Sequence, residues 1–160
     1  MADLAEGGEA PDFTLTDGAG NPWRLADQKG RLAVVYFYPK DDTSGCTAEA
    51  IDFSRLKPEF EAAGASVIGI SPDSAASHRK FSDKYGLDLA LGADPERTAI
   101  EAYGVWAEKS MYGRKYMGVD RSTFLVGPDG RILRIWRKVK VPGHAQEVLD
   151  SVKQAGTAAG

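Results

Sequence analysis

One continuous apolar segment limits the folds that this 160-residue chain can adopt. Leu32 to Tyr38 reads LAVVYFY, which is rich in β-branched and aromatic residues and contains no charged residue. A strand with this composition is typically buried on both faces, as in the centre of an α/β sheet. The segment is also far too short to cross a bilayer, which takes ~20 residues. The chain is therefore predicted to fold around a central strand that is covered on both sides.

Further strand patterns occur on both sides of this segment. A Gly127-Pro128-Asp129-Gly130 turn joins two of them and predicts a β-hairpin near the C-terminus. An early strand precedes the central one and predicts an N-terminal β extension. The predicted strands are Asp12–Thr16, Leu32–Tyr38, Val67–Ile70, Leu87–Leu91, Thr123–Val126 and Arg131–Trp136.

Helical patterns alternate with these strands. The predicted helices are one that opens near Cys46 and ends at Gly64, then Ala75–Tyr85, Pro95–Tyr103 and His144–Ala155. Pro58 is expected to kink the first helix, and Asp94 is expected to cap the third. Strands that alternate with helices indicate a three-layer α/β domain. Their order resembles a thioredoxin-like fold, with a central mixed β-sheet flanked by helices, more than a Rossmann fold.

Length and composition bound the organisation of the chain. Apolar residues make up 42% and charged residues 27%, which is typical of a globular domain. We predict a single domain over residues 1–160, with flexible ends at about 1–8 and 156–160. The formal charge is 20 − 23 = −3, which does not favour nucleic-acid binding. The N-terminus does not resemble a signal peptide, so no membrane association and a cytoplasmic location are expected.

The chain has one cysteine, Cys46. One cysteine excludes an internal disulfide, a CxxC redox pair and any multi-cysteine metal site. Cys46 follows the central strand and falls in the first turn of a predicted helix, where unpaired N–H groups and the helix dipole favour a thiolate. Loops at the carboxyl ends of strands are also where α/β domains place chemistry. Position alone leaves two interpretations open, a buried structural thiol and a lone nucleophile.

The neighbours of Cys46 resemble the peroxiredoxin motif Pro-x-x-x-Thr-x-x-Cys, here Pro39, Thr43 and Cys46. A wider match covers most of the chain in the right order: YFYPKDDTSGCTAEA, GISPDS, SHRKF, GVDRSTFLVGPDGRI and WRKVKVPGH. These blocks are similar to the bacterioferritin-comigratory-protein or PrxQ branch of the family. The resemblance implies a thiol-dependent peroxidase for hydrogen peroxide and organic hydroperoxides. It also implies a monomer that needs no cofactor or metal and is recycled by thioredoxin or a similar dithiol protein.

The resemblance further implies how three residues near the helix start would act. Cys46 would be the peroxidatic thiolate, which attacks a peroxide oxygen and becomes a sulfenic acid. The Thr43 hydroxyl would bond both the thiolate and the peroxide. The backbone amides of Gly45 and Cys46 would bind the peroxide oxygens, because fixed donors stabilise the charge that develops there.

Three more residues are assigned by the same resemblance. Arg121, in the segment Asp120-Arg121-Ser122-Thr123, matches the distant arginine that family members place against the thiolate. Its permanent charge favours the ionised sulfur and orients the peroxide. Pro39 would exclude water from the site. Glu49 would hold Arg121 or a neighbouring backbone group in place.

The sequence departs from the family pattern at two points. Ser44 stands where the motif commonly has proline, and the resolving cysteine is missing. One PrxQ subgroup carries that cysteine at the position of Ile51, and another at the position of Ser82. We interpret Ser82 as the replaced residue, either in an engineered variant or in a natural one-cysteine enzyme. Two alternatives remain: a one-cysteine peroxidase that uses a low-molecular-weight thiol, and a redox sensor or interaction module without turnover.

Other polar features are interpreted as structural. His78 and His144 are expected at the surface or at helix caps rather than as a base for Cys46. Asp41 and Asp42 are expected to be solvated turn residues rather than a metal site. The basic segment Arg131–Lys140 is expected to protect a strand edge rather than to bind nucleic acid.

Overall fold

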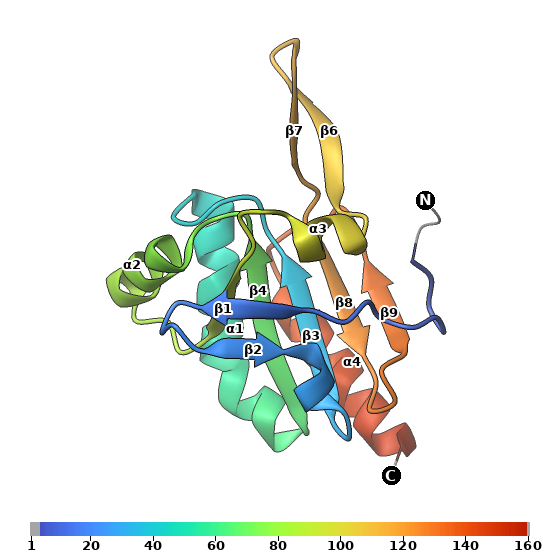
Figure 1. The fold of residues 1–160 in the computed structure, drawn as a ribbon. Helices are drawn as coiled ribbons and strands as arrows, with labels where there is room; N and C mark the ends of the chain where they lie inside the picture. Colours follow the sequence, from blue (N-terminus) through green and yellow to red (C-terminus); the bar gives the residue numbers. More distant parts are fainter. Residues whose placement is uncertain (1–3, 160) are drawn as a thin grey trace.

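A computed structural model of the chain describes residues 4–159. It shows a twisted sheet with helices on both sides and a long hairpin that projects from one end (Figure 1). The elements are β1 Thr14–Asp17, β2 Pro22–Arg24, η1 Leu25–Gln28, β3 Leu32–Phe37, α1 Ser44–Ala62, β4 Ala65–Ser71, α2 Ala75–Tyr85, β5 Ala90–Ala93, α3 Thr98–Ala102, β6 Trp106–Met111, β7 Arg114–Val119, β8 Ser122–Val126, β9 Ile132–Trp136 and α4 His144–Ala159.

The main sheet is mixed and contains β3 near its middle. Its strand order is β2-β1-β5-β4-β3-β8-β9. β3 pairs in parallel with β4, starting at Leu32 opposite Ala65, and antiparallel with β8, where Phe37 lies opposite Ser122. All six residues of β3 are buried, which confirms the expectation of a doubly covered central strand. The α/β class, the mixed sheet and the N-terminal β extension are confirmed.

Alternation along β3 divides the interior into two cores. Leu32, Val34 and Tyr36 face α1 and α4, whereas Ala33, Val35 and Phe37 face α3 and the N-terminal strands. Strand side chains point alternately to the two faces of a sheet, so each face needs its own apolar cover. Apolar residues of α1 and α4 complete the first core: Ala50, Phe53, Leu56, Phe60, Val148, Leu149 and Val152.

Two predicted elements differ from the observed ones in position or length. The third parallel strand is Ala90–Ala93, later than the predicted Leu87–Leu91. α3 begins only at Thr98 because Arg97 adopts a left-handed conformation with φ 61°, which a regular helix does not contain. The N-cap residue is therefore Arg97 and not the predicted Asp94, although the Asp94 carboxylate accepts hydrogen bonds from two backbone amides at the helix start. α1 continues through Pro58 and ends at Ala62.

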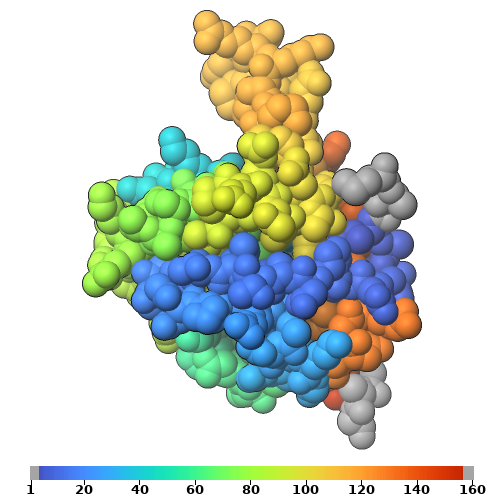
Figure 2. All heavy atoms as spheres, viewed as in Figure 1, coloured from blue at the N-terminus to red at the C-terminus, as the bar shows by residue number. Residues whose placement is uncertain are grey.

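The projecting hairpin of β6 and β7 is an element that the sequence patterns did not predict. It forms a separate two-stranded sheet and extends away from the body (Figures 1 and 2). Its turn is Tyr112-Gly113, both with positive φ, which suits a tight two-residue hairpin turn. Four large apolar side chains are exposed on it: Met111, Tyr112, Tyr116 and Met117. Val119 is the one buried residue of the two strands, so they lack the alternating pattern by which strands are recognised.

Both ends of the described chain are connected to regular elements of the fold. The segment before β1 lies along β9, where the Gly7 amide donates to the Ile132 carbonyl and the Ile132 amide donates to the Gly8 carbonyl. α4 continues to Ala159, past the predicted end. Flexible ends at about 1–8 and 156–160 stay a prediction, because backbone contacts and helix bounds do not measure mobility, and residues 1–3 and 160 lie outside the described part. Within residues 4–159, none of the helices is both long and apolar enough to span a bilayer.

Candidate active site

Cys46 lies in the first turn of α1, at the carboxyl end of β3. Thr43 is the N-cap residue, and the first bond of the helix runs from the Thr47 amide to the Thr43 carbonyl. The amides of residues 44–46 therefore have no partner inside the helix, and they create a local positive potential. The Cys46 side chain is only 2% exposed. The sulfur is thus both buried and placed where an anion is favoured.

Arg121, which comes from a distant segment of the chain, contacts the sulfur of Cys46. It lies between β7 and β8, and the antiparallel pairing of β8 with β3 brings it next to the loop that carries Cys46. Its Nη2 donates to Cys46 Sγ at 3.2 Å, and its Nη1 donates to Glu49 Oε1 at 2.5 Å. A planar guanidinium can serve both acceptors at once, which the single ammonium of a lysine does less well.

Gly45 gives Arg121 room to approach. A Cβ atom at position 45 would lie 3.4 Å from Arg121 Nη2. A side chain larger than alanine would therefore compete with the guanidinium for the space beside the sulfur.

Burial and mutual attraction together set the charges of Glu49 and Arg121. Glu49 is 1% exposed, and burial raises its pKa to about 7 even though the Arg121 guanidinium opposes that rise. Burial alone would lower the pKa of Arg121, but Glu49 and Cys46 raise it above its ordinary value. Arg121 therefore keeps its charge, and Glu49 holds it without fully neutralising it. The structure places Glu49 where the sequence prediction put it, against Arg121.

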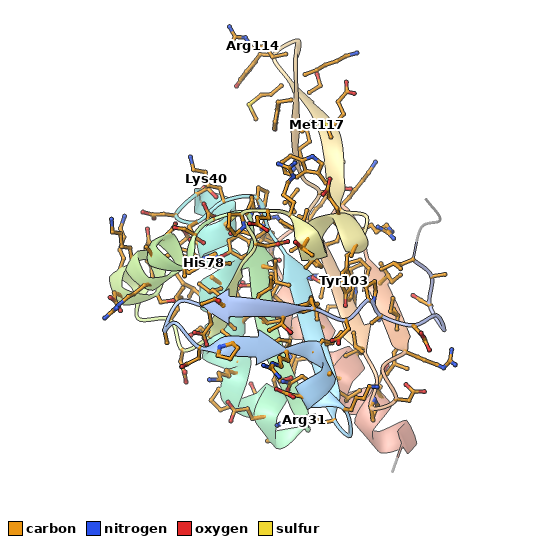
Figure 3. All side chains as sticks on the ribbon, in the orientation of Figure 1. Arg31, Lys40, His78, Tyr103, Arg114 and Met117 are labelled. Carbon is orange, nitrogen blue, oxygen red and sulfur yellow. The ribbon has the colours of Figure 1, made fainter. Side chains whose placement is uncertain are left out.

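The Thr43 hydroxyl makes a different contact from the predicted one. It donates to the Lys40 carbonyl oxygen at 2.9 Å, within the loop that joins β3 to α1. The hydroxyl hydrogen is thus engaged with the backbone rather than with the sulfur, and the lone pairs of Oγ1 remain available as acceptors. Lys40 itself points outward from this loop (Figure 3). Pro39 lies half-buried in the same loop, directly after β3.

Asp41 and His78 are not the surface residues that the sequence interpretation expected. His78 is fully buried and Asp41 is 7% exposed. His78 Nδ1 lies 2.8 Å from Asp41 Oδ2, and His78 Nε2 lies 2.9 Å from the Gly92 carbonyl oxygen. Figure 3 shows His78 directed from α2 toward the sheet, beneath the loop between β3 and α1 that carries Lys40. Only Asp42 is exposed as predicted, and it binds Lys84 Nζ at 2.7 Å.

His144 is likewise buried rather than exposed. Its Nε2 lies 2.8 Å from Thr123 Oγ1, and its ring meets Phe53 and Trp136 edge-on. Burial lowers the pKa of His144 to about 4, so the imidazole is neutral at physiological pH. It bonds Thr123 rather than Cys46, in agreement with the structural role that was predicted for it.

Ser82 and Ile51 mark the two positions where a second cysteine was considered. Ser82 lies in α2 and is partly exposed, on the wall of a groove that Arg79, Leu87 and Asp88 also line. Ile51 lies in α1 and is 41% exposed. Cys46 is the free thiol of the chain, and among the described residues the side chain that donates a hydrogen bond to its sulfur is Arg121.

Chemically, the arrangement suits an anionic sulfur that attacks a small polar substrate. The helix start and Arg121 favour the thiolate, and the amides of residues 44–46 together with Thr43 supply donors and an acceptor beside it. Within residues 4–159, the closest hydrogen-bond partners of the two imidazoles are Asp41, Gly92 and Thr123 rather than the sulfur.

Comparison with known proteins places this site in a family. Residues 7–135 match the AhpC/TSA family. The chain is 46% identical to Peroxiredoxin Bcp of Bacillus subtilis over 147 residues, which cover 92% of this chain and 94% of that protein. It is 45% identical to Peroxiredoxin Bcp of Xanthomonas campestris, with 89% of each chain covered.

Solved structures agree with these relatives. The bacterioferritin comigratory protein of Xanthomonas campestris superposes with a TM-score of 0.88 at 42% identity, over 95% of this chain and 99% of that one. A Cys-to-Ser mutant of PrxQ from Xylella fastidiosa superposes with a TM-score of 0.91 at 39% identity, over 96% and 98% of the two chains. The sequence and structural matches together show that this chain belongs to the AhpC/TSA family and is an enzyme of the Bcp or PrxQ branch of the peroxiredoxins.

Proposed function

We propose that this chain reduces hydrogen peroxide and organic hydroperoxides with Cys46 as the attacking thiolate. The sulfur forms a bond to the terminal peroxide oxygen while the O–O bond breaks. Cys46 becomes a sulfenic acid, and the other oxygen leaves with the bonding electrons and is protonated to water or an alcohol. The sulfur is oxidised by two electrons and the peroxide is reduced by two, so the step needs no cofactor.

One observation carries this proposal, the 3.2 Å contact between Arg121 Nη2 and Cys46 Sγ at the start of α1. A guanidinium on a nearly buried sulfur favours the thiolate and presents a further donor to the leaving oxygen. Gly45 and Cys46 supply backbone amides, and Thr43 Oγ1 offers an acceptor for the peroxide O–H. Pro39 covers the site from the loop without adding a backbone N–H donor.

The first test compares variants in peroxide consumption. Cys46→Ser is expected to lose all activity, because serine keeps the shape but does not form the nucleophile. Arg121→Lys is expected to lower the rate of Cys46 oxidation about 100-fold, the usual effect of losing one fixed donor. Ser66→Ala, at the far end of β4, serves as the control with unchanged activity. Peroxide consumption that persists in Cys46→Ser would overturn the proposal.

The reductant must come from outside this chain. Cys46 is the sole cysteine, so its sulfenic acid cannot close an intramolecular disulfide. PrxQ of Xanthomonas campestris has been solved as separate Cys-to-Ser mutants at its positions 48 and 84, which are 84 − 48 = 36 residues apart. Cys46 and Ser82 have the same separation, 82 − 46 = 36. This supports Ser82 as the place of the missing resolving cysteine.

We also propose that thioredoxin recycles the enzyme, and that the enzyme is a cytoplasmic monomer. The lone cysteine favours a second candidate, a peroxidase that a low-molecular-weight thiol reduces. Steady-state peroxide consumption with thioredoxin and its reductase, set against consumption with glutathione, distinguishes the two. Stoichiometric oxidation without turnover by either reductant would instead indicate a redox sensor or interaction module. Mass spectrometry of peroxide-treated protein identifies the sulfenic, sulfinic or mixed-disulfide form of Cys46.

A further inference from the structure

A buried polar cluster lies beneath the loop between β3 and α1, and the peroxidase chemistry does not use it. The Asp41 carboxylate is its centre, five residues before Cys46. Oδ1 accepts from the Tyr38 hydroxyl at 2.6 Å, and Oδ2 accepts from the Ser77 hydroxyl at 2.7 Å. His78 Nδ1 lies 2.8 Å from the same Oδ2. A buried carboxylate with three side-chain partners has little freedom to move.

His78 connects this carboxylate to the sheet. Its Nε2 donates to the Gly92 carbonyl of β5 at 2.9 Å, and the imidazole is fully buried. Both ring nitrogens are therefore engaged, one on the loop and one on a strand. Burial alone would raise the pKa of Asp41, but the hydrogen bonds from His78, Tyr38 and Ser77 lower it below its ordinary value. The loop is thus tied to α2 and β5 through an ionised group.

Two further contacts tie the same loop to its neighbours. The Asp41 amide donates to Asp73 Oδ2 at 2.8 Å, in the loop that precedes α2. Asp42 binds Lys84 Nζ at 2.7 Å and accepts from the Tyr85 hydroxyl, both near the end of α2. Asp42 has a φ of 60°, an uncommon backbone conformation that persists only where surrounding contacts hold it.

These contacts oppose a movement that the proposed function requires. Cys46 is 2% exposed, and its sulfenic acid must meet a thiol from another molecule, because the chain holds no second cysteine. Attack by a protein thiol requires the two sulfurs to come within bonding distance, which a buried sulfur at a helix start does not permit. The loop and the first turn of α1 must therefore move, and the bonds of Asp41 and Asp42 to α2 must break when they do.

Resting on the proposed function, we infer that His78 is a positioning residue, which through Asp41 holds the loop closed over Cys46 and controls how readily it opens for the reductant. In the closed state, Cys46 meets Arg121 and reacts with peroxide. In the open state, the sulfur is reachable by a large thiol. Loss of the imidazole shifts the population toward the open state. Peroxide oxidation then becomes slower, while capture of the sulfur by bulky reagents becomes faster.

The lone cysteine makes the test direct, because any thiol reagent reports on Cys46 alone. The probes are N-ethylmaleimide and a maleimide carried on a polyethylene glycol chain. The measured quantity is the labelling rate with the bulky maleimide divided by the labelling rate with N-ethylmaleimide. This ratio cancels changes in the ionisation of the thiol, because both reagents attack through the thiolate. His78→Phe is expected to raise this ratio about tenfold because, of the two hydrogen bonds that it removes, the one to Asp41 is the bond that holds the loop. It is expected to lower the rate of Cys46 oxidation by hydrogen peroxide by a similar factor. His78→Gln, which keeps one donor, is expected to fall between wild type and His78→Phe.

Two controls separate positioning from general destabilisation. Tyr103→Phe removes a partly buried hydrogen bond to the Pro11 carbonyl beside the other core, and it is expected to leave both the ratio and the oxidation rate unchanged. Lys84→Met breaks the exposed tie to Asp42 without disturbing the core, and it is expected to raise the ratio in the same direction by a smaller factor. If His78→Phe does not fold, His78→Gln and Lys84→Met together keep the test valid.

Hydrogen exchange of the amides in residues 39–47 provides a third measurement, with faster exchange expected in His78→Phe but not in Tyr103→Phe. An unchanged labelling ratio in both His78→Phe and Lys84→Met would overturn the inference. So would equal increases in His78→Phe and Tyr103→Phe. If the wild type consumed no peroxide, the proposed function would fail, but the labelling and exchange results would still decide whether His78 holds the loop.

Discussion

Arg121 is the residue on which the site depends most. Its two terminal nitrogens bond Cys46 and Glu49, which lie 75 and 72 positions away in sequence. Glu49 is buried, and only one of its oxygens has a partner among the described residues, since Oε2 makes no hydrogen bond. A half-satisfied buried carboxylate costs free energy when it is ionised. The position of Arg121 is therefore maintained at some expense of stability.

This cost predicts a pH dependence of folding. Because burial raises the pKa of Glu49 from its ordinary 4.5 to about 7, the folded state binds the proton more tightly than the unfolded state. The stabilisation is complete below about pH 4.5 and is lost as the pH rises through about 7. Glu49→Gln cannot ionise. We expect its free energy of unfolding to rise by about 3 kcal/mol relative to that of the wild type between pH 4.5 and pH 8. This is the free energy that corresponds to the difference between a pKa of 4.5 and a pKa of about 7.

Urea unfolding of the reduced proteins from pH 4 to pH 9 measures this difference. Glutamine keeps the acceptor for Arg121 Nη1, so the two proteins should converge at low pH. A constant offset between the two curves, with no change of slope between pH 4.5 and pH 7, would show that Glu49 is not titrating in this range.

At the scale of elements, the parallel pairing of β3 with β4 places a second loop beside the loop that leads to Cys46. It brings the loops that follow the two strands together, so the Asp41 amide reaches Asp73. Ligand and catalytic groups in α/β sheets gather at the carboxyl ends of strands for this reason. In the same pair, Tyr36 lies opposite Gly69, and its ring covers the glycine.

Gly69 is therefore expected to tolerate no side chain. A Cβ at this position would lie 2.5 Å from Tyr36 Cζ, inside a fully buried core. We expect Gly69→Ala to lower the free energy of unfolding by about 1–3 kcal/mol, since overpacking forces backbone shifts. The double variant Gly69→Ala with Tyr36→Leu should recover part of that loss. Chemical denaturation measures both, and an additive double variant would show that the ring is not the cause.

At the scale of the whole molecule, opening the site must also disturb its contacts with α2. Ser82 lies on that helix, whereas Cys46 lies at the start of α1. Restoring a thiol at position 82 would require the two helix segments to approach each other. Disulfide formation in Ser82→Cys would therefore show that both helix segments rearrange.

We expect Ser82→Cys to form an intramolecular disulfide with Cys46 after one equivalent of peroxide. Mass spectrometry would show the loss of two hydrogen atoms and no mass from a sulfinic acid. Ser66→Cys, at the opposite end of β4 from the active-site loop, is the matched control and should form no such bond. Oxidation of Ser82→Cys to the sulfinic acid without a disulfide would contradict the assignment of position 82.

Local patterns predicted most of the elements but not how polar residues are buried. His78, His144 and Asp41 were assigned to the surface because polar side chains are exposed unless they are paired. Their partners are Gly92, Thr123 and groups on α2, which are distant in sequence. The β6–β7 hairpin was missed because its strands have a single buried residue, and α3 was drawn too long because the left-handed turn at Arg97 has no marker in its residue type.

By itself, the sequence determined the α/β class, the buried central strand and the place of Cys46 at a helix start, since these follow from hydrophobic period and helix-start signals within a short window. Its motif blocks also identified the peroxiredoxin family and named Arg121. Only the tertiary structure decided that Arg121 meets both Cys46 and Glu49, that Thr43 bonds Lys40, and that His78 ties the loop to β5. The physical reason is that these contacts depend on strand pairing and on burial, and neither is encoded in the residues nearby.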